Sequence, residues 1–215
     1  MTSITFISDL HGYKPKLTEG DLLIIAGDLT ARDSRKEYEE FNTWLANLPF
    51  KCKIFIGGNH DTLLERSEVK IEGLGIHYLN DSGIEYNGLK IWGSPWTTRF
   101  RGQNPLCMAF SVKTELELKK HFDLIPKGID ILISHSPPYG ILDQCINGRC
   151  GSEMLRQAIL RTKPKICCFG HIHENGGKTE QYDDICYINA SVVNETYQNI
   201  NLPVKMVLNH QLPMN

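Results

Sequence analysis

The sequence predicts an α/β fold built around a parallel sheet, and three observations indicate it. Near the N-terminus, two apolar runs flank an amphipathic segment in the order strand, helix, strand, which is typical of a parallel sheet. Further short apolar runs recur along the chain, and several stop at a polar residue, as strands buried on both faces do. Asn87-Gly88 lies between alternating flanks and predicts a hairpin. The length of 215 residues fits one domain, residues 1–215.

The individual elements follow from apolar periodicity and from the residues that end each run. For the first helix, Asp33 or Ser34 supplies the N-cap, one face is apolar and Pro49 lies just beyond its end. A short helical turn is expected after Asp61. We expect strands at residues 4–9, 22–26, 53–56, 76–79, 84–86, 89–92, 129–134, 165–169, 187–191 and 204–208, and helices at residues 33–48, 114–122 and 152–161.

Five of these apolar runs end in Asp, Asn or His. The residues concerned are Asp9 with His11, Asp28, Asn59 with His60, His135, and His171 with His173. Because ligands of open α/β sheets bind beyond the carboxyl ends of the strands, we expect these side chains at one site. Any one of them alone would fit an ordinary polar turn, but five together favour a metal site.

The donor types indicate which metals such a site would take. A ligand set of nitrogen and oxygen without sulfur favours Mn, Fe or Zn, and it does not resemble a zinc site with thiolate ligands. Without His60, seven candidate ligands remain, which exceeds what one ion takes, so two ions sharing one carboxylate is the economical interpretation. His60 adds a proton that is mobile near neutral pH, and Asp61 adds a carboxylate that could hold the imidazole tautomer. A purely structural metal site is the alternative, although such sites tend to be closed and four-coordinate.

Composition and charge exclude several classes of protein. The chain has 23 basic and 25 acidic residues and no run of Lys or Arg, which argues against binding polymeric nucleic acid. No apolar run approaches the length of a membrane span, and residues 1–8 lack the features of a targeting signal. Seven cysteines without paired Cys-x-x-Cys motifs predict reduced thiols in a cytoplasmic protein.

A loop-rich segment at residues 93–107 supplies candidate substrate-binding residues. Trp96, Arg99 and Phe100 could form an aromatic and basic wall over a phosphate ligand, together with Arg101. Equally, Trp96 and Phe100 could serve only to cover the core. The sequence leaves both interpretations open.

The polar residues at the strand ends occur in the order of a known signature. Asp9-x-His11, Gly27-Asp28, Gly58-Asn59-His60-Asp61, His135 and Gly170-His171-x-His173 resemble the complete signature of calcineurin-like metallophosphoesterases. Further stretches resemble the subgroup of metallophosphoesterase-domain-containing proteins akin to class III cyclic nucleotide phosphodiesterases. These stretches are Phe41-Asn42-x-Trp44-Leu45, Gly93-Ser94-Pro95-Trp96, residues 124–133, residues 169–174 and Asn189-Ala190-Ser191.

This resemblance implies a fold and a set of roles. The fold would be a four-layer α/β/β/α sandwich of two mixed sheets flanked by helices, of the metallophosphoesterase type. One divalent ion would be held by Asp9, His11, Asp28 and His173, and the other by Asp28, Asn59, His135 and His171. Mn or Fe is favoured, with Zn, Ni or Mg as alternatives. His60 would donate a proton to the leaving oxygen or steady the phosphoryl group, with Asp61 as its orienting partner.

The resemblance also implies an activity. We expect a dinuclear metal-dependent phosphodiesterase that hydrolyses small nucleotides, cyclic ones included, by attack of a metal-bridging hydroxide. A phosphomonoesterase or phosphoprotein phosphatase is the first alternative, and a non-catalytic metal-binding interaction protein is the second. The expected partner is a small phosphoester, with no membrane and no polymeric nucleic acid.

Overall fold

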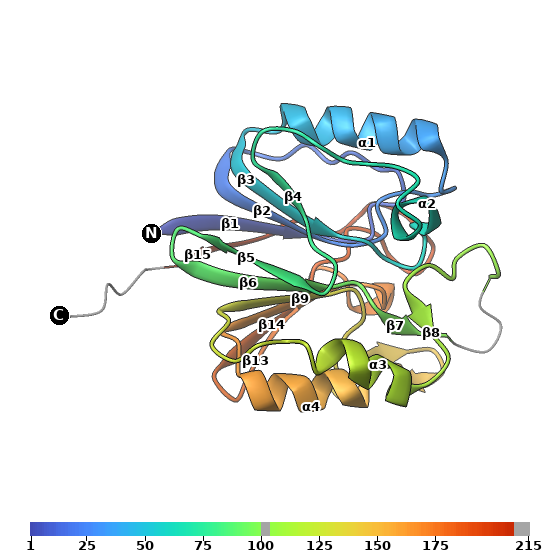
Figure 1. The fold of residues 1–215 in the computed structure, drawn as a ribbon, viewed down its shortest axis with the longest axis vertical. Helices are drawn as coiled ribbons and strands as arrows, with labels where there is room; N and C mark the ends of the chain where they lie inside the picture. Colours follow the sequence, from blue (N-terminus) through green and yellow to red (C-terminus); the bar gives the residue numbers. More distant parts are fainter. Residues whose placement is uncertain (100–103, 209–215) are drawn as a thin grey trace.

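Two mixed sheets lie face to face between two layers of helices in the computed structural model, which describes residues 1–99 and 104–208 (Figure 1). The first sheet contains, in spatial order, β15 (Val204–Leu208), β1 (Thr2–Ile7), β2 (Gly20–Ala26), β3 (Phe50–Ile56) and β4 (Ile76–Tyr78). The second sheet contains β13 (Thr179–Tyr182), β14 (Ile185–Asn189), β12 (Ile166–Phe169), β9 (Ile131–Ser134), β6 (Leu89–Ser94) and β5 (Ser82–Tyr86).

Helices cover the outer faces of both sheets. Figure 1 shows α1 (Arg35–Asn47) over the first sheet, and α3 (Glu115–Phe122) with α4 (Glu153–Thr162) over the second. The shorter elements are α2 (Thr62–Glu65), β7 (Thr97–Thr98), β8 (Ser111–Val112), β10 (Gln144–Cys145), β11 (Gly148–Arg149) and the 3₁₀ turn η1 (His173–Asn175). The expected four-layer sandwich is therefore confirmed.

Three buried apolar clusters fill the spaces between the four layers, and β2 shows why its sequence is continuously apolar. Leu22 and Ile24 pack in the cluster between the two sheets, whereas Leu23 and Ile25 pack in the cluster beneath α1. Because successive side chains of a strand point to opposite faces, a strand covered on both sides needs apolar residues at every position.

The helix starts follow local capping chemistry. The Ser34 hydroxyl accepts a hydrogen bond from the Glu37 backbone N–H, and the Glu37 carboxylate accepts one from the Ser34 backbone N–H at 3.1 Å. This capping box decides between the two predicted N-caps in favour of Ser34. Thr114 and Glu117 form the same box at the start of α3.

Hairpin and edge strands divide into those that the sequence predicted and those that it did not. Asn87 and Gly88 have φ values of 49° and 75°, which confirms the expected hairpin between β5 and β6. The sequence did not predict β13, in which all four residues are exposed. A strand without a buried face has no apolar alternation to detect.

The cysteines differ from the expectation. Cys145 and Cys150 form a disulfide that closes the hairpin of β10 and β11, with their Cα atoms 6.3 Å apart. The prediction that all thiols are reduced is therefore wrong at these two residues. It relied on the absence of Cys-x-x-Cys motifs and did not anticipate a turn that brings two cysteines five residues apart into contact. Cys167 and Cys168 are buried thiols, as expected.

Helices able to cross a membrane are absent from residues 1–99 and 104–208: none there is both long and apolar enough. The cytoplasmic location stays a prediction.

Candidate metal centre

The five polar strand ends meet at one edge of the molecule. β1, β2 and β3 run parallel in the first sheet, and β9 and β12 run parallel in the second, so the carboxyl ends within each sheet lie together. A hydrogen bond between the two sheets brings the strand ends of both sheets into one site. The His171 backbone N–H, after β12, donates to the carboxylate of Asp9, after β1, at 3.0 Å.

The first group of potential metal ligands contains Asp9, His11 and His173, whose ligand atoms lie within 4.8 Å of one another. His173 Nε2 lies 3.3 Å from Asp9 Oδ1 and 3.3 Å from His11 Nε2. Three donor atoms that converge on one point are the arrangement that a divalent cation requires.

The second group contains Asp28, His135 and His171. His135 Nδ1 donates to the Ala26 carbonyl at 2.9 Å, which fixes the ring and directs Nε2 into the site. His135 Nε2 then lies 3.0 Å from Asn59 Oδ1 and 3.4 Å from Asp28 Oδ1. These are the residues that the sequence assigned to the second ion.

Asp28 lies between the two groups. Its Oδ1 is 3.4 Å from His135 Nε2, and its Oδ2 is 3.7 Å from His11 Nε2. Each carboxylate oxygen therefore faces a different group, as the predicted bridging role requires. The structure brings all seven predicted ligands together, while their binding of metal stays a prediction.

The ionisation of Asp9, His11 and His171 suits metal binding, whereas the protonated form of His135 is favoured near pH 7. Burial lowers the pKa of His11 to about 4, and burial together with the charge of His135 lowers the pKa of His171 to about 3. Both rings are neutral near pH 7, the form that binds metal. Although burial opposes it, the hydrogen bond and charge of His173 lower the pKa of Asp9 to about 2. Burial also opposes ionisation of His135, but the charge of Asp28 raises the pKa of this imidazole to about 9.

The backbone of the site is strained where it presents ligands. Asp9, His11, Asp28 and His171 have φ values of 53°, 42°, 53° and 65°, in the left-handed region that residues other than glycine rarely adopt. Such strain costs about 1–3 kcal/mol per residue and is concentrated at functional sites. Gly170 is required for a different reason, because a Cβ there would overlap the carboxylate of Asp9.

His60 lies beside the first group and lines the adjoining cavity. Its ring centroid is 4.6 Å from that of His11, and its Nδ1 lies 3.6 Å from Cys107 Sγ. His60 also forms a third group of potential metal ligands with His11 and Asp28, whose ligand atoms lie within 4.8 Å of one another.

Asp61 does not orient His60, contrary to the expectation. Among the described residues, its fully buried carboxylate accepts hydrogen bonds from the backbone N–H groups of Leu29 at 3.1 Å and Gly58 at 2.8 Å, and from the hydroxyl of Thr30 at 3.3 Å. Burial and the charge of Asp28 raise the pKa of Asp61 to about 7. The carboxylate therefore joins the loops that follow β2 and β3, and the adjacency of Asp61 to His60 in the sequence was misleading.

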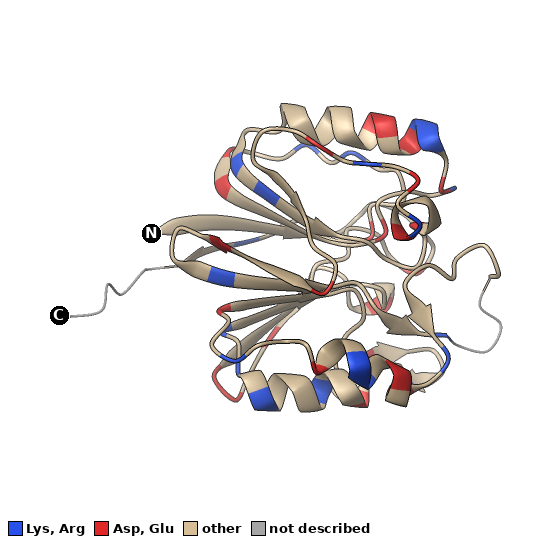
Figure 2. Ribbon diagram, in the orientation of Figure 1, with Lys and Arg blue, Asp and Glu red and all other residues tan. Residues whose placement is uncertain are grey.

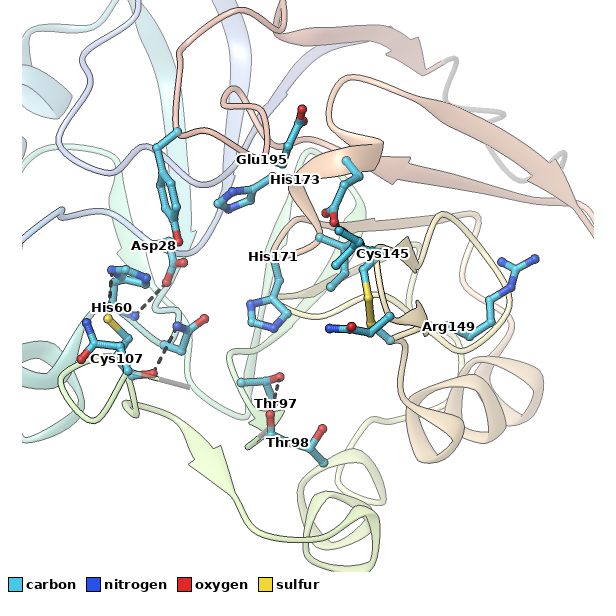
Figure 3. Close-up of a pocket in the computed structure, with 18 residues that line it drawn as sticks. Asp28, His60, Thr97, Thr98, Cys107, Cys145, Arg149, His171, His173 and Glu195 are labelled. Carbon is cyan, nitrogen blue, oxygen red and sulfur yellow. Dashed lines mark hydrogen bonds between the residues drawn. A yellow bond between two sulfur atoms is a disulfide. The ribbon is translucent and has the colours of Figure 1, made fainter. Parts of the chain in front are cut away.

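A cavity of about 830 Å³ opens beside both ligand groups. Figure 3 shows His60 and Cys107 on one side of it, Thr97 and Thr98 below, and Cys145 with Arg149 on the far side. Ile146 and Asn147, at the tip of the hairpin that the disulfide closes, complete this far side, and Tyr197 contributes from the loop after β14. Neither the hairpin nor Tyr197 was predicted as part of the site, because their positions depend on contacts distant in sequence.

Trp96 and Arg99, two residues of the predicted aromatic and basic wall, do not line the cavity. The half-buried Trp96 ring stacks on His121 with centroids 3.8 Å apart, and it does not line the cavity. Arg99 is exposed and does not line it either. Phe100 and Arg101 lie outside the described residues. For Trp96 the structure favours the interpretation that it covers the core.

Comparison with known proteins identifies the family. A family model described as calcineurin-like phosphoesterase matches residues 2–175. The chain belongs to this family. Its nitrogen and oxygen donors also fit the divalent ions on which such phosphoesterases depend, and together these observations support a metal-dependent phosphoester hydrolase.

Individual relatives of this calcineurin-like phosphoesterase cover most of the chain. It is 34% identical over 233 residues to metallophosphoesterase domain-containing protein 1 of Homo sapiens, covering 94% of this chain and 70% of that protein. It is 35% identical over 223 residues to UPF0046 protein T07D4.2 of Caenorhabditis elegans, covering 88% of this chain and 54% of that protein. These relatives confirm the predicted superfamily and subgroup.

Among solved structures, TT1561 of Thermus thermophilus superposes with a TM-score of 0.61. The sequences are 16% identical, and the match covers 87% of this chain and 88% of the other. At this identity the similarity shows the fold alone.

Proposed function

We propose that this calcineurin-like phosphoesterase is a phosphodiesterase that acts on small nucleotides, cyclic ones included. The observation that carries the proposal is the cavity beside the candidate metal centre. Its volume of about 830 Å³ falls within the range of roughly 300–1,000 Å³ typical of small-molecule sites. A single nucleotide would fit there with its phosphate at the ligand groups.

The chemistry of the cavity wall supports a substrate of low charge. Away from the predicted ligands and His60, the neutral lining residues are Thr97, Thr98, Asn104, Cys107, Cys145, Ile146, Asn147, Cys150, Ile172 and Tyr197. Arg149 is the one Lys or Arg among the described lining residues, and it pairs with Asp143 at 2.6 Å. Figure 3 shows its side chain directed away from His171. Glu174 and Glu195 add negative charge.

This wall favours a diester over the alternatives. A phosphodiester carries one negative charge and two organic groups, whereas a phosphomonoester near neutral pH carries up to two charges and a phosphoprotein presents further acidic groups. A neutral to acidic wall opposes additional negative charge. Figure 2 shows basic and acidic residues mixed over both halves of the molecule, which supports a small substrate in preference to a nucleic-acid polymer.

The geometry of the site supports the following roles for the chain's own residues. Asp9, His11, Asp28 and His173 would hold one ion, and Asp28, Asn59, His135 and His171 the other. When bound, two such ions polarise the phosphoryl group and lower the pKa of water. His60 lines the cavity, so it would donate a proton to the departing oxygen. Asp61 holds the loops that carry Asp28 and Asn59.

Hydrolysis of bis-p-nitrophenyl phosphate by the metal-stripped protein tests the proposal, with Mn, Fe, Ni, Zn and Mg added back singly. We expect metal-dependent turnover of this diester to exceed turnover of p-nitrophenyl phosphate, and His60→Ala to abolish most of it. Faster turnover of the monoester would replace the proposal with a phosphomonoesterase. Two bound ions per chain without turnover of either ester would indicate an interaction protein.

A further inference from the structure

The ring of Tyr197 contacts two members of the first group of predicted ligands, His11 and His173. Its ring centroid is 4.8 Å from that of His11 and 5.0 Å from that of His173, and it is 6.5 Å from the ring of His60. Tyr197 also lines the cavity. It comes from the loop between β14 and β15, beyond the residues 2–175 that the family model matches.

The loop holds Tyr197 in a specified position. Asn194 Oδ1 accepts hydrogen bonds from the backbone N–H groups of Thr196 at 3.1 Å and Gln198 at 2.8 Å, and the Tyr197 N–H donates to the Asn194 carbonyl at 2.8 Å. The Tyr13 hydroxyl donates to the Tyr197 carbonyl at 3.2 Å. These contacts keep Tyr197 at a φ of 59°, a conformation unfavourable for an aromatic residue.

The Tyr197 hydroxyl is available to a ligand. It makes no hydrogen bond to any residue in the described part of the chain, and the residue as a whole remains 49% exposed. A phenol has an ordinary pKa of about 10, so it is protonated at neutral pH and can donate a hydrogen bond. A phenol offers this donor without adding a positive charge to the wall.

We propose that Tyr197 is a further substrate-contacting residue, whose hydroxyl donates a hydrogen bond to a non-bridging phosphoryl oxygen. The inference rests on the proposed function for the location of the phosphoryl group, between His60 and the predicted ligands. A donor aimed at an oxygen on which charge develops stabilises the transition state more than the ground state. The contacts of the Tyr197 ring with His11 and His173 would position the side chain, and its hydroxyl would donate the hydrogen bond to the phosphoryl oxygen.

The test compares Tyr197→Phe with wild type, because this change removes the hydroxyl and retains the ring. Tyr182→Phe is the matched control, since Tyr182 lies on β13 with its ring against Arg156 and does not line the cavity. Three quantities are measured on metal-loaded protein: bound metal per chain, affinity for inorganic phosphate by calorimetry, and kcat/KM for bis-p-nitrophenyl phosphate. For Tyr197→Phe we expect unchanged metal, about fivefold weaker phosphate binding and a loss of about ten- to hundredfold in kcat/KM.

The outcomes separate this inference from the proposed function. Phosphate affinity and turnover equal to wild type in Tyr197→Phe would overturn the inference. Loss of metal in that variant would also overturn it, because Tyr197 would then support the ligands and not the substrate. The wild type could instead hydrolyse neither ester and still bind phosphate more tightly than Tyr197→Phe does. That result would contradict the proposed function but would support the contact between Tyr197 and the phosphoryl group.

Discussion

The backbone N–H of His171 donates to the carboxylate of Asp9, which precedes it by 162 residues. This bond joins the strand end of one sheet to that of the other, so the candidate centre exists only when the two sheets are packed together. Each sheet alone carries part of the ligand set. Metal binding should therefore be coupled to the integrity of the whole sandwich.

Asp28 and His60 should separate metal binding from turnover. Asp28→Asn removes a charge that faces both ligand groups, so we expect it to lower bound metal from two ions to one or none per chain. His60→Ala should keep both ions and lose about a hundredfold or more in kcat. Elemental analysis of both purified variants, alongside the diester assay, measures the difference. Equal loss of metal in the two variants would contradict the assigned roles.

Gly170→Ala should damage the centre by steric overlap alone. A Cβ at this position would overlap the Asp9 carboxylate and the Ser8 side chain, so we expect metal affinity to fall about ten- to hundredfold with the fold retained. Gly140→Ala is the matched control, because its φ of 86° imposes backbone strain while no atom lies within 4 Å of the added Cβ. Metal titration with circular dichroism checks both variants. A greater loss of affinity in the control would show that strain, and not overlap, decides the effect.

Asp61→Ala should destabilise the fold even without metal. It leaves the buried N–H groups of Leu29 and Gly58 without their acceptor, which we expect to cost about 2–4 kcal/mol of unfolding free energy. Asp123→Ala is the control, since its exposed pair with Lys119 on α3 contributes less than about 1 kcal/mol. Urea unfolding in chelator measures both. If Asp61→Ala lowers the unfolding free energy no more than the control does, Asp61 is not structural and the catalytic interpretation is supported.

The disulfide should affect substrate binding more than chemistry. Cys145 and Cys150 close a hairpin that lines the cavity but holds none of the predicted ligands, so the double variant Cys145→Ser with Cys150→Ser should raise KM about two- to fivefold and leave kcat unchanged. Steady-state kinetics on the diester gives both constants. Alkylation before and after reduction, followed by mass spectrometry, establishes that the wild type carries the bond. A fall in kcat with KM unchanged would show that the hairpin acts on the reacting groups.

The sequence predicted what short-range signals determine. The strand ends at Asp9, Asp28 and His135 could be located because a strand buried on both faces contains a short, largely apolar run, and polar residues follow each of these runs. The α1 boundary could be located because capping is local to Ser34 and Glu37.

Long-range contacts set the limit of that prediction. Asp61 was misassigned because its partner Leu29 lies 32 residues away, and no local pattern reports such a bond. The same holds for Tyr197, which reaches the site through a turn ordered by Asn194 and through the pairing of β15 with β1. The role of Trp96 was ambiguous because an aromatic residue near a site can either line a cavity or cover the core, and the sequence does not distinguish these roles. The stacking of Trp96 on His121 in the structure distinguishes them.

The hairpin at residues 144–150 has a consequence for how such proteins diversify. The predicted ligands lie at the ends of strands whose neighbours fix them, whereas this part of the cavity wall is a short hairpin, and surface connections of this kind generally tolerate insertion and substitution. Substitutions in this hairpin can therefore change the cavity wall without changing the predicted metal ligands. Descendants that keep every ligand can differ in the molecules they cleave, and an unchanged set of ligands does not by itself identify a common substrate.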